Sequence, residues 1–163
     1  MSGRVKGKTL IARDEGDDVD GVLIKLYGEE TNGAVSIIEQ LFEPGLLLPP
    51  HIHQNDVWLH VHEGEMHARV GEEVVRATPG CWVLKPRRIP HTMWNAGDEP
   101  ARITELYTPG GFELFFRDFA DRLRQGPVTL DELNHLGEPH GIRFFDDWIP
   151  DLKAAYGLQV VGE

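Results

Sequence analysis

A succession of short apolar or alternating segments, separated by turn-forming residues, fills the chain up to about Pro109. Turns are indicated at Asn32-Gly33, Glu63-Gly64, Gly71, Pro79-Gly80 and Gly97-Asp98. We expect strands near residues 8–12, 21–27, 34–43, 57–62, 66–70, 73–77, 81–85, 91–95 and 101–107. Many short strands at this spacing are typical of an all-β sandwich or barrel.

Beyond Pro109 the apolar period changes from that of a strand to that of a helix. Aromatic and aliphatic residues recur at helical spacing at Phe112, Phe115, Phe116, Phe119 and Leu123. This pattern predicts an amphipathic helix that ends at Gly126-Pro127, with its phenylalanines buried against the barrel or against a partner subunit. The chain therefore divides into a β-barrel over residues 1–109 and a helical extension over 110–163.

Two further helices are expected in this extension. Thr129-Leu-Asp-Glu132 resembles a capping box, in which a threonine and a glutamate satisfy each other's backbone N–H groups at a helix start. A last short helix is expected from Pro150 to Tyr156, because Gly157 follows it and glycine commonly ends helices.

Composition narrows the partners and the compartment. The formal net charge of −11 argues against nucleic acid and anionic membranes as electrostatic partners. Cys81 is the single cysteine, so the chain can form neither an internal disulfide nor a cysteine-based zinc cage. We expect it to be a buried structural thiol in its strand. Neither a signal peptide nor a membrane span is predicted, and a cytoplasmic location is expected.

The chemistry is indicated by His51-Ile52-His53. Residues i and i+2 of an extended segment point to the same side, so both imidazoles can reach one point. A third histidine, His91, follows Pro90, which holds the preceding backbone extended. Three imidazoles converging inside a β scaffold would bind one divalent transition metal, namely Fe, Mn, Ni, Zn or Cu.

These residues resemble the two motifs of the cupin superfamily. Gly45, His51, His53 and Gly64 fit the spacing of the first motif, and Gly80, Pro86, His91 and Asn95 fit that of the second. The segments 61–65, 107–112 and 155–158 look like single-domain, quercetin-dioxygenase-like cupins. The resemblance implies a jelly-roll barrel, or double-stranded β-helix, with a metal held by the three histidines inside its wider mouth.

The chain departs from these motifs at two positions. Arg88 stands where the second motif has glycine, which concerns the geometry of the turn. Val57 stands where the first motif has a glutamate that usually binds the metal in the family. Asp56 is adjacent, but a shift of one residue in a strand points a side chain to the other face. Glu39 or Gln40, on a strand expected to line the barrel, could replace the missing carboxylate.

Most other histidines are expected to lie outside the site. Strand alternation places His60 and His62 on the face opposite Val57, although a β-bulge could reverse this for His60. We expect surface or interface positions for these two histidines and for His67, and surface positions for His135 and His140. Arg87 and Arg88 could meet an anionic substrate near the barrel mouth, but a solvated turn is the favoured interpretation.

A three-histidine site without a carboxylate ligand has a net charge of +2, which favours an anionic, chelating substrate. Val57, Leu59 and Met93 are the predicted pocket residues, and their apolar character suits an aromatic or enolic small molecule. The leading hypothesis is a metal-dependent, dioxygenase-like cupin enzyme, with no catalytic residue identified. The alternatives are a zinc-dependent isomerase or cyclase and a non-enzymatic, small-molecule-binding cupin. A homodimer is expected, with the phenylalanine-rich helix and Trp58 as candidate contacts.

Overall fold

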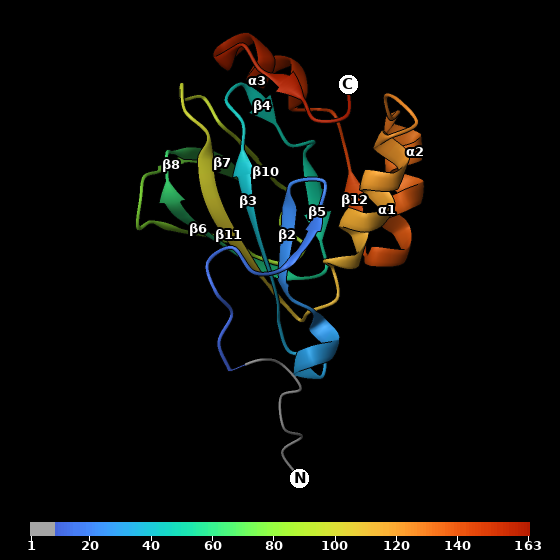
Figure 1. The fold of residues 1–163 in the computed structure, drawn as a ribbon. Coiled ribbons are helices and arrows are strands. Elements are labelled where there is room, and N and C mark those ends of the chain that lie inside the picture. Colours follow the sequence, from blue (N-terminus) through green and yellow to red (C-terminus); the bar gives the residue numbers. More distant parts are fainter. Residues whose placement is uncertain (1–8) are drawn as a thin grey trace.

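The computed structural model describes residues 9–163, which form a β-barrel of two facing sheets with a helical extension. Helices α1 and α2 lie side by side along one flank of the barrel, and α3 lies near one of its ends (Figure 1). The expectation of an all-β jelly-roll barrel with a helical C-terminal extension is confirmed.

The first sheet has the strand order β1-β2-β3-β11-β6-β9, and all its neighbouring strands are antiparallel. Its strands are β1 (Asp17–Val19), β2 (Val22–Leu26), β3 (Ser36–Phe42), β6 (Asp56–Glu63), β9 (Trp82–Lys85) and β11 (Ala101–Thr108). Burial alternates strictly along β11, so that Ile103, Glu105 and Tyr107 point into the barrel. This alternation follows from the two-residue period of a strand.

The second sheet has the order β12-β5-β10-β4-β13, and β7 pairs with both β10 and β8. Its strands are β4 (Leu46–Leu47), β5 (His51–His53), β7 (Met66–Val70), β8 (Glu73–Ala77), β10 (His91–Trp94), β12 (Ile142–Phe144) and β13 (Gln159–Val160). The pair β13 and β4 is parallel, whereas the other pairs are antiparallel. Because β12 and β13 follow residue 109, the C-terminal extension contributes strands to the barrel as well as helices.

The helical segments are η1 (Gly28–Thr31), α1 (Leu114–Leu123), α2 (Leu130–Gly137), η2 (Glu138–His140) and α3 (Ile149–Tyr156). The predicted capping box is confirmed, because the Thr129 side chain accepts from the Glu132 N–H and the Glu132 carboxylate accepts from the Thr129 N–H. The predicted end of α3 is confirmed as well, with Gly157 in the left-handed conformation.

The phenylalanines of α1, and Phe112 just before this helix, pack on the barrel of their own chain. Phe112 and Phe115 are buried in one cluster with Ile24, Ile38 and Tyr107. Phe116 and Phe119 pack against the same cluster. The phenylalanines are therefore buried against the barrel, whereas a contact with a partner subunit stays a prediction. Helix α1 closes one side of the barrel interior.

Two sequence expectations are wrong. Residues 9–12 form no strand, and Lys25 Nζ donates instead to the backbone oxygens of Ala12 and Arg13, at 2.6 and 2.8 Å; residue 8 lies outside the described residues. Cys81 is exposed rather than buried, because the strand begins only at Trp82 and the inward positions fall on Val83 and Lys85.

Within residues 9–163, none of the helices has the length and apolar character that a membrane crossing requires. The cytoplasmic location stays a prediction.

Candidate metal centre

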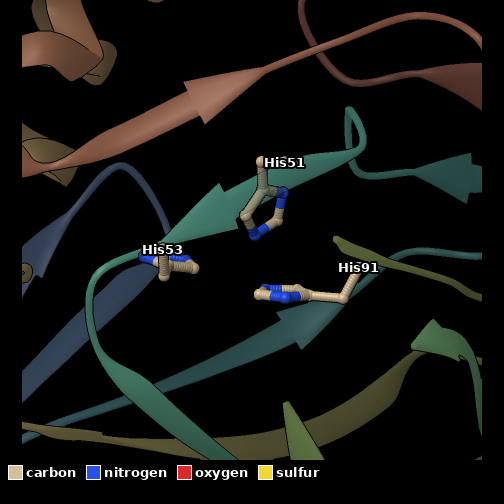
Figure 2. Close-up of side chains that lie close together, drawn as sticks. All are labelled: His51, His53 and His91. Atoms are coloured by element: carbon tan, nitrogen blue, oxygen red, sulfur yellow. The ribbon is translucent and has the colours of Figure 1, made fainter. Parts of the chain in front are cut away.

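The three predicted histidines lie together inside the barrel. His51 and His53 come from β5 and His91 from the neighbouring strand β10, where His91 is paired directly with His51. One ring nitrogen from each residue lies within 4.8 Å of the others, and all three side chains are buried. Figure 2 shows the rings turned toward one another. The sequence spacing and the antiparallel register therefore bring three imidazole ligands to one point.

Backbone carbonyls orient two of the rings. His51 Nδ1 lies 2.7 Å from the Pro49 carbonyl oxygen, and His91 Nδ1 lies 3.0 Å from that of Ile89. Each Nδ1 is therefore the protonated donor nitrogen, because a carbonyl oxygen can only accept. This leaves Nε2 of both rings unprotonated, which is the form that binds a metal.

Two ring nitrogens in the cluster are buried without a hydrogen-bond partner among the described residues, namely His53 Nδ1 and His91 Nε2. A buried polar atom left unpaired costs about 1–3 kcal/mol. A cation bound between the rings would satisfy such an atom. Three neutral nitrogen donors also suit the transition metals that imidazole prefers. The residues present therefore fit a divalent transition-metal ion.

The three imidazoles are neutral at physiological pH. Burial lowers the pKa of His51 to about 3, and the nearby Lys85 ammonium adds to this effect. Burial also holds the pKa values of His53 and His91 well below the ordinary value, with neighbouring histidines and Lys85 contributing. Since only a neutral imidazole binds a metal, the cluster needs no deprotonation at neutral pH.

A cavity of about 240 Å³ adjoins the cluster, and His51 and His53 form part of its wall. Most of the remaining wall is aromatic or aliphatic and comes from the barrel and α1. Its aromatic members are Phe42, Tyr107, Phe112, Phe115, Phe116, Phe119 and Phe144. The histidine cluster therefore borders a largely apolar chamber.

The three predicted pocket residues fall at different depths. Met93 lines the cavity. Val57 and Leu59 point inward but do not line the cavity. Val57 packs in the cluster of Tyr107 and Phe112, and Leu59 packs in the cluster of Met93. A substrate contact at any of the three stays a prediction.

Sequence reasoning missed a buried polar group in the cavity wall. Glu105 Oε2 lies 3.2 Å from Lys85 Nζ and accepts a hydrogen bond from the Tyr107 hydroxyl at 2.9 Å. All three side chains are buried, and Glu105 and Tyr107 line the cavity. The alternation of residues 101–107 was a usable signal, because Glu105 falls in phase with Ile103 and Tyr107.

The three residues considered as replacements for the motif carboxylate lie in different positions relative to the histidine cluster. Glu39 faces the outside of the barrel, where it pairs with Arg102, so it does not reach the site. Gln40 lines the cavity but carries no charge. Asp56 points away from the interior, as predicted, and pairs with Arg87 at 3.0 Å.

The remaining histidines lie away from the cluster. His60 packs its ring against Trp82, and His62 Nε2 lies 2.6 Å from Thr104 Oγ1, both on the outer face of the first sheet. His67 is half-buried beside Trp94 and Tyr156. Surface positions are also found for His135, which is exposed, and for His140, which pairs with Asp118 at 2.7 Å and is partly covered.

The two arginines before His91 belong to a turn. Arg87 is held by Asp56, and Arg88 Nε donates to Gln54 Oε1 at 3.3 Å, which supports the interpretation as a solvated turn. Arg88 has a φ of 63°, in the left-handed region that favours glycine. Its N–H donates to the His53 carbonyl at 2.8 Å, so this turn is tied to the ligand strand β5.

Comparison with known proteins agrees with this architecture. Residues 38–107 match the family described as the cupin domain, and this stretch contains all three histidines. Over this stretch the sequence and the fold are therefore similar to those of a cupin domain. No curated protein matches the sequence.

Solved structures share the fold at low sequence identity. KdgF from a Halomonas species is 20% identical, with a TM-score of 0.55 over 65% of this chain and 99% of its own. An uncharacterised protein with a double-stranded β-helix domain from Klebsiella pneumoniae is 19% identical, with a TM-score of 0.53 over 64% of this chain and 93% of its own. At these identities the likeness concerns the fold alone.

A salicylate 1,2-dioxygenase from Pseudaminobacter salicylatoxidans is 25% identical over 47% of this chain, with a TM-score of 0.45. This chain covers 22% of that dioxygenase, so the likeness is confined to a small part of the larger protein.

Proposed function

We propose that this protein is a metal-dependent enzyme of the dioxygenase-like type that acts on an aromatic or enolic small molecule. The observation that carries the proposal is the buried cluster of His51, His53 and His91, which includes unpartnered ring nitrogens and opens onto an aromatic cavity. The three histidines would hold the ion. When bound, a transition metal supplies Lewis acidity and, if it is redox-active, one-electron chemistry with dioxygen.

The charge of the site selects for anionic substrates. Three neutral imidazoles leave the full +2 charge of a divalent ion uncompensated by its ligands, because Val57 replaces the motif carboxylate. An enolate, catecholate or carboxylate would balance this charge better than a neutral molecule. The phenylalanine walls contributed by α1 would exclude water and pack against an aromatic ring. This combination supports a small, flat, ionisable substrate.

A second candidate function follows from the polar group in the cavity wall. Glu105 and Tyr107 place a carboxylate and a hydroxyl beside the cavity, which would serve proton transfer without oxygen. Such an arrangement favours a zinc-dependent isomerase or cyclase. The two candidates share the metal and the substrate class and differ in their need for dioxygen.

A homodimer is also part of the proposal. Trp58 and Trp82 are exposed, at 40% and 56%, on the outer face of the first sheet, and β9 is the last strand of that sheet. Large exposed apolar side chains beside a free sheet edge favour contact with another chain. Sedimentation equilibrium tests this, with a dimer mass expected and a monomer mass at micromolar concentration contradicting it.

The function is tested with protein reconstituted separately with Fe, Mn, Ni, Cu and Zn. Oxygen uptake and product formation are measured with flavonols and β-diketones, in air and under nitrogen. Oxygen uptake coupled to product is expected for a redox-active metal form. Turnover of the zinc form under nitrogen would favour the isomerase or cyclase instead.

Two variants sharpen this test. His91→Ala removes a ligand and is expected to abolish turnover, whereas His62→Ala removes a histidine from the outer face and is expected to preserve it. Tight ligand binding without turnover in every metal form would contradict an enzymatic role and favour a binding protein.

A further inference from the structure

The cavity has one buried carboxylate in its wall among the described residues. Asp20 and Glu43 also line the cavity, but both are exposed, whereas Glu105 is only 3% exposed. Burying a carboxylate is costly unless its charge is compensated, and Lys85 provides that compensation. A buried carboxylate in the wall of a cavity beside the candidate metal site is therefore better explained by a function than by packing.

The partners of Glu105 surround the position where the motif glutamate is missing. In the first sheet, Val57 is paired on one side with Lys85 of β9 and on the other side with Tyr107 of β11. Glu105 is two residues from Tyr107 on the same inward face and is paired with Leu59. Glu105 is therefore diagonal to Val57 on the neighbouring strand, and long side chains at diagonal positions can meet. Lys85 and Tyr107 thus flank Val57, while the carboxylate that they bind comes from the next inward position of β11.

The hydrogen bonds of Glu105 leave one oxygen available. Both Lys85 Nζ and the Tyr107 hydroxyl contact Oε2. Oε1 has no hydrogen-bond partner in the described part of the chain, and the residue lines the cavity. Burial and the nearby Glu105 carboxylate raise the pKa of Tyr107 well above its ordinary value, so its hydroxyl remains a donor. One face of the carboxylate is therefore fixed, and the other can meet a ligand.

The position of Glu105 argues for a role toward the substrate rather than the metal. The atoms that lie within 4.8 Å of one another as a candidate ligand group belong to His51, His53 and His91, and Glu105 is not part of that group. A metal ligand would have to converge on the same point as these nitrogens, and the Glu105 oxygens do not belong to the converging group. A carboxylate that lines the same cavity as His51 and His53, but lies outside their group, is placed to accept a proton from a molecule bound there.

We infer that Glu105 replaces the carboxylate that is missing at Val57 and acts as the catalytic base toward an enolic or phenolic substrate. This inference rests on the proposed function. The O–H bond of an enol or phenol, or the C–H bond between the two carbonyls of a diketone, breaks; the proton forms a bond with Glu105 Oε1, and the electron pair stays on the substrate as an enolate or phenolate. Lys85 and Tyr107 act as positioning residues that hold the other oxygen.

The inference is tested with the zinc-loaded full chain and acetylacetone as the probe. The readouts are metal content, the ultraviolet difference spectrum of bound enolate, and the rate at which the central C–H positions of acetylacetone exchange with deuterium oxide, relative to buffer. Glu105→Gln is expected to keep the metal, to lose the enolate spectrum and to slow catalysed exchange by about 100-fold or more, the usual contribution of a general base.

Glu39→Gln is the matched control, because Glu39 is also an ion-paired glutamate of the first sheet but faces outward. It is expected to behave like the parent protein. The double variant Glu105→Gln/Val57→Glu returns a carboxylate to the motif position between Lys85 and Tyr107, and is expected to recover part of the exchange. If either Glu105 variant does not fold, the double variant Lys85→Met/Glu105→Leu, which leaves no uncompensated buried charge, replaces it in the comparison with Glu39→Gln.

The outcomes separate this inference from the proposed function. Parent and Glu105→Gln proteins that hold zinc and exchange the probe at equal rates would overturn the inference and leave the metal-dependent function standing. Loss of zinc from Glu105→Gln, with zinc retained by Glu39→Gln, would make Glu105 a determinant of metal binding and would likewise overturn it. A parent protein that binds no metal would overturn both.

Discussion

Lys85 and Glu105 form an ion pair inside the barrel, with Nζ and Oε2 3.2 Å apart and side-chain exposures of 1% and 4%. The two residues lie on β9 and β11, and β6 runs between these strands. Lys85 also lies 3.7 Å from the sulfur of Met93, which lines the cavity. The ion pair therefore links strand β9 of the first sheet to the cavity beside the histidine cluster. Because a buried ion pair contributes little net stability, its presence here fits a functional role better than a structural one.

Removing one partner of this pair should be strongly destabilising. Lys85→Met leaves the Glu105 carboxylate buried without its counter-charge, and the expected loss in the free energy of unfolding is about 3–5 kcal/mol. Adding Glu105→Leu to it should recover most of that loss, because two apolar side chains leave no uncompensated charge. Urea unfolding of the parent and both variants measures this. A single variant that loses less than about 1 kcal/mol would show that the charge of Glu105 is compensated elsewhere.

The buried histidines should make the metal-free protein less stable at mildly acidic pH. The pKa of His51 is about 3 in the folded state, below the ordinary value of 6.5. Between these values the unfolded chain binds the proton and the folded chain does not, so stability falls as the pH is lowered. From pH 7 to pH 5 this linkage amounts to about 2 kcal/mol for His51 alone.

His53 and His91 shift in the same direction and add to the effect. Urea unfolding of the metal-free protein at pH 7, 6 and 5 measures the slope, and His51→Gln should make it shallower. This window lies above the ordinary carboxylate range, so acidic groups contribute little there. A free energy of unfolding that is equal or higher at pH 5 would contradict the burial of neutral imidazoles.

Replacing Arg88 by glycine, the residue that the second motif has at this position, should stabilise the protein. The left-handed φ of 63° at Arg88 costs a non-glycine residue roughly 1–2 kcal/mol. Part of this gain is lost to the greater freedom of glycine in the unfolded chain. Arg88→Gly is therefore expected to raise the free energy of unfolding by up to about 1 kcal/mol.

Arg88→Ala is the control, because it removes the guanidinium and keeps a β-carbon in the left-handed conformation. It should be no more stable than the parent. If Arg88→Ala and Arg88→Gly stabilise the protein equally, the guanidinium rather than the backbone conformation is the source of the strain.

Motif spacing and strand alternation predicted the arrangement of the site where the information is local. His51 and His53 share a face because they are two residues apart, and His60 and His62 fall outside because they are out of phase with Val57. A β-bulge does occur nearby, between Arg102 and Ile103, and does not turn His60 inward. The capping box at Thr129 was predictable for the same reason, since it lies within four successive residues.

What could not be predicted depends on neighbours that are distant in sequence. Lys85 and Glu105 meet across an intervening strand, and no local pattern gives the register that brings them together. The strands β4 and β13 have two residues each; β13 exists through its pairing with β4, and β4 also pairs with β10. Cys81 was misplaced because the strand begins one residue later than its apolar run.

Metal binding by His51, His53 and His91 is measured by elemental analysis of untagged protein. His51→Ala removes one ligand, whereas His60→Ala removes a histidine of the outer face and serves as the matched control. We predict about one transition-metal ion per chain in the parent and in His60→Ala, and a loss of that ion in His51→Ala. Absence of metal from the parent, even after reconstitution with Fe, Mn, Ni, Cu or Zn, would contradict it.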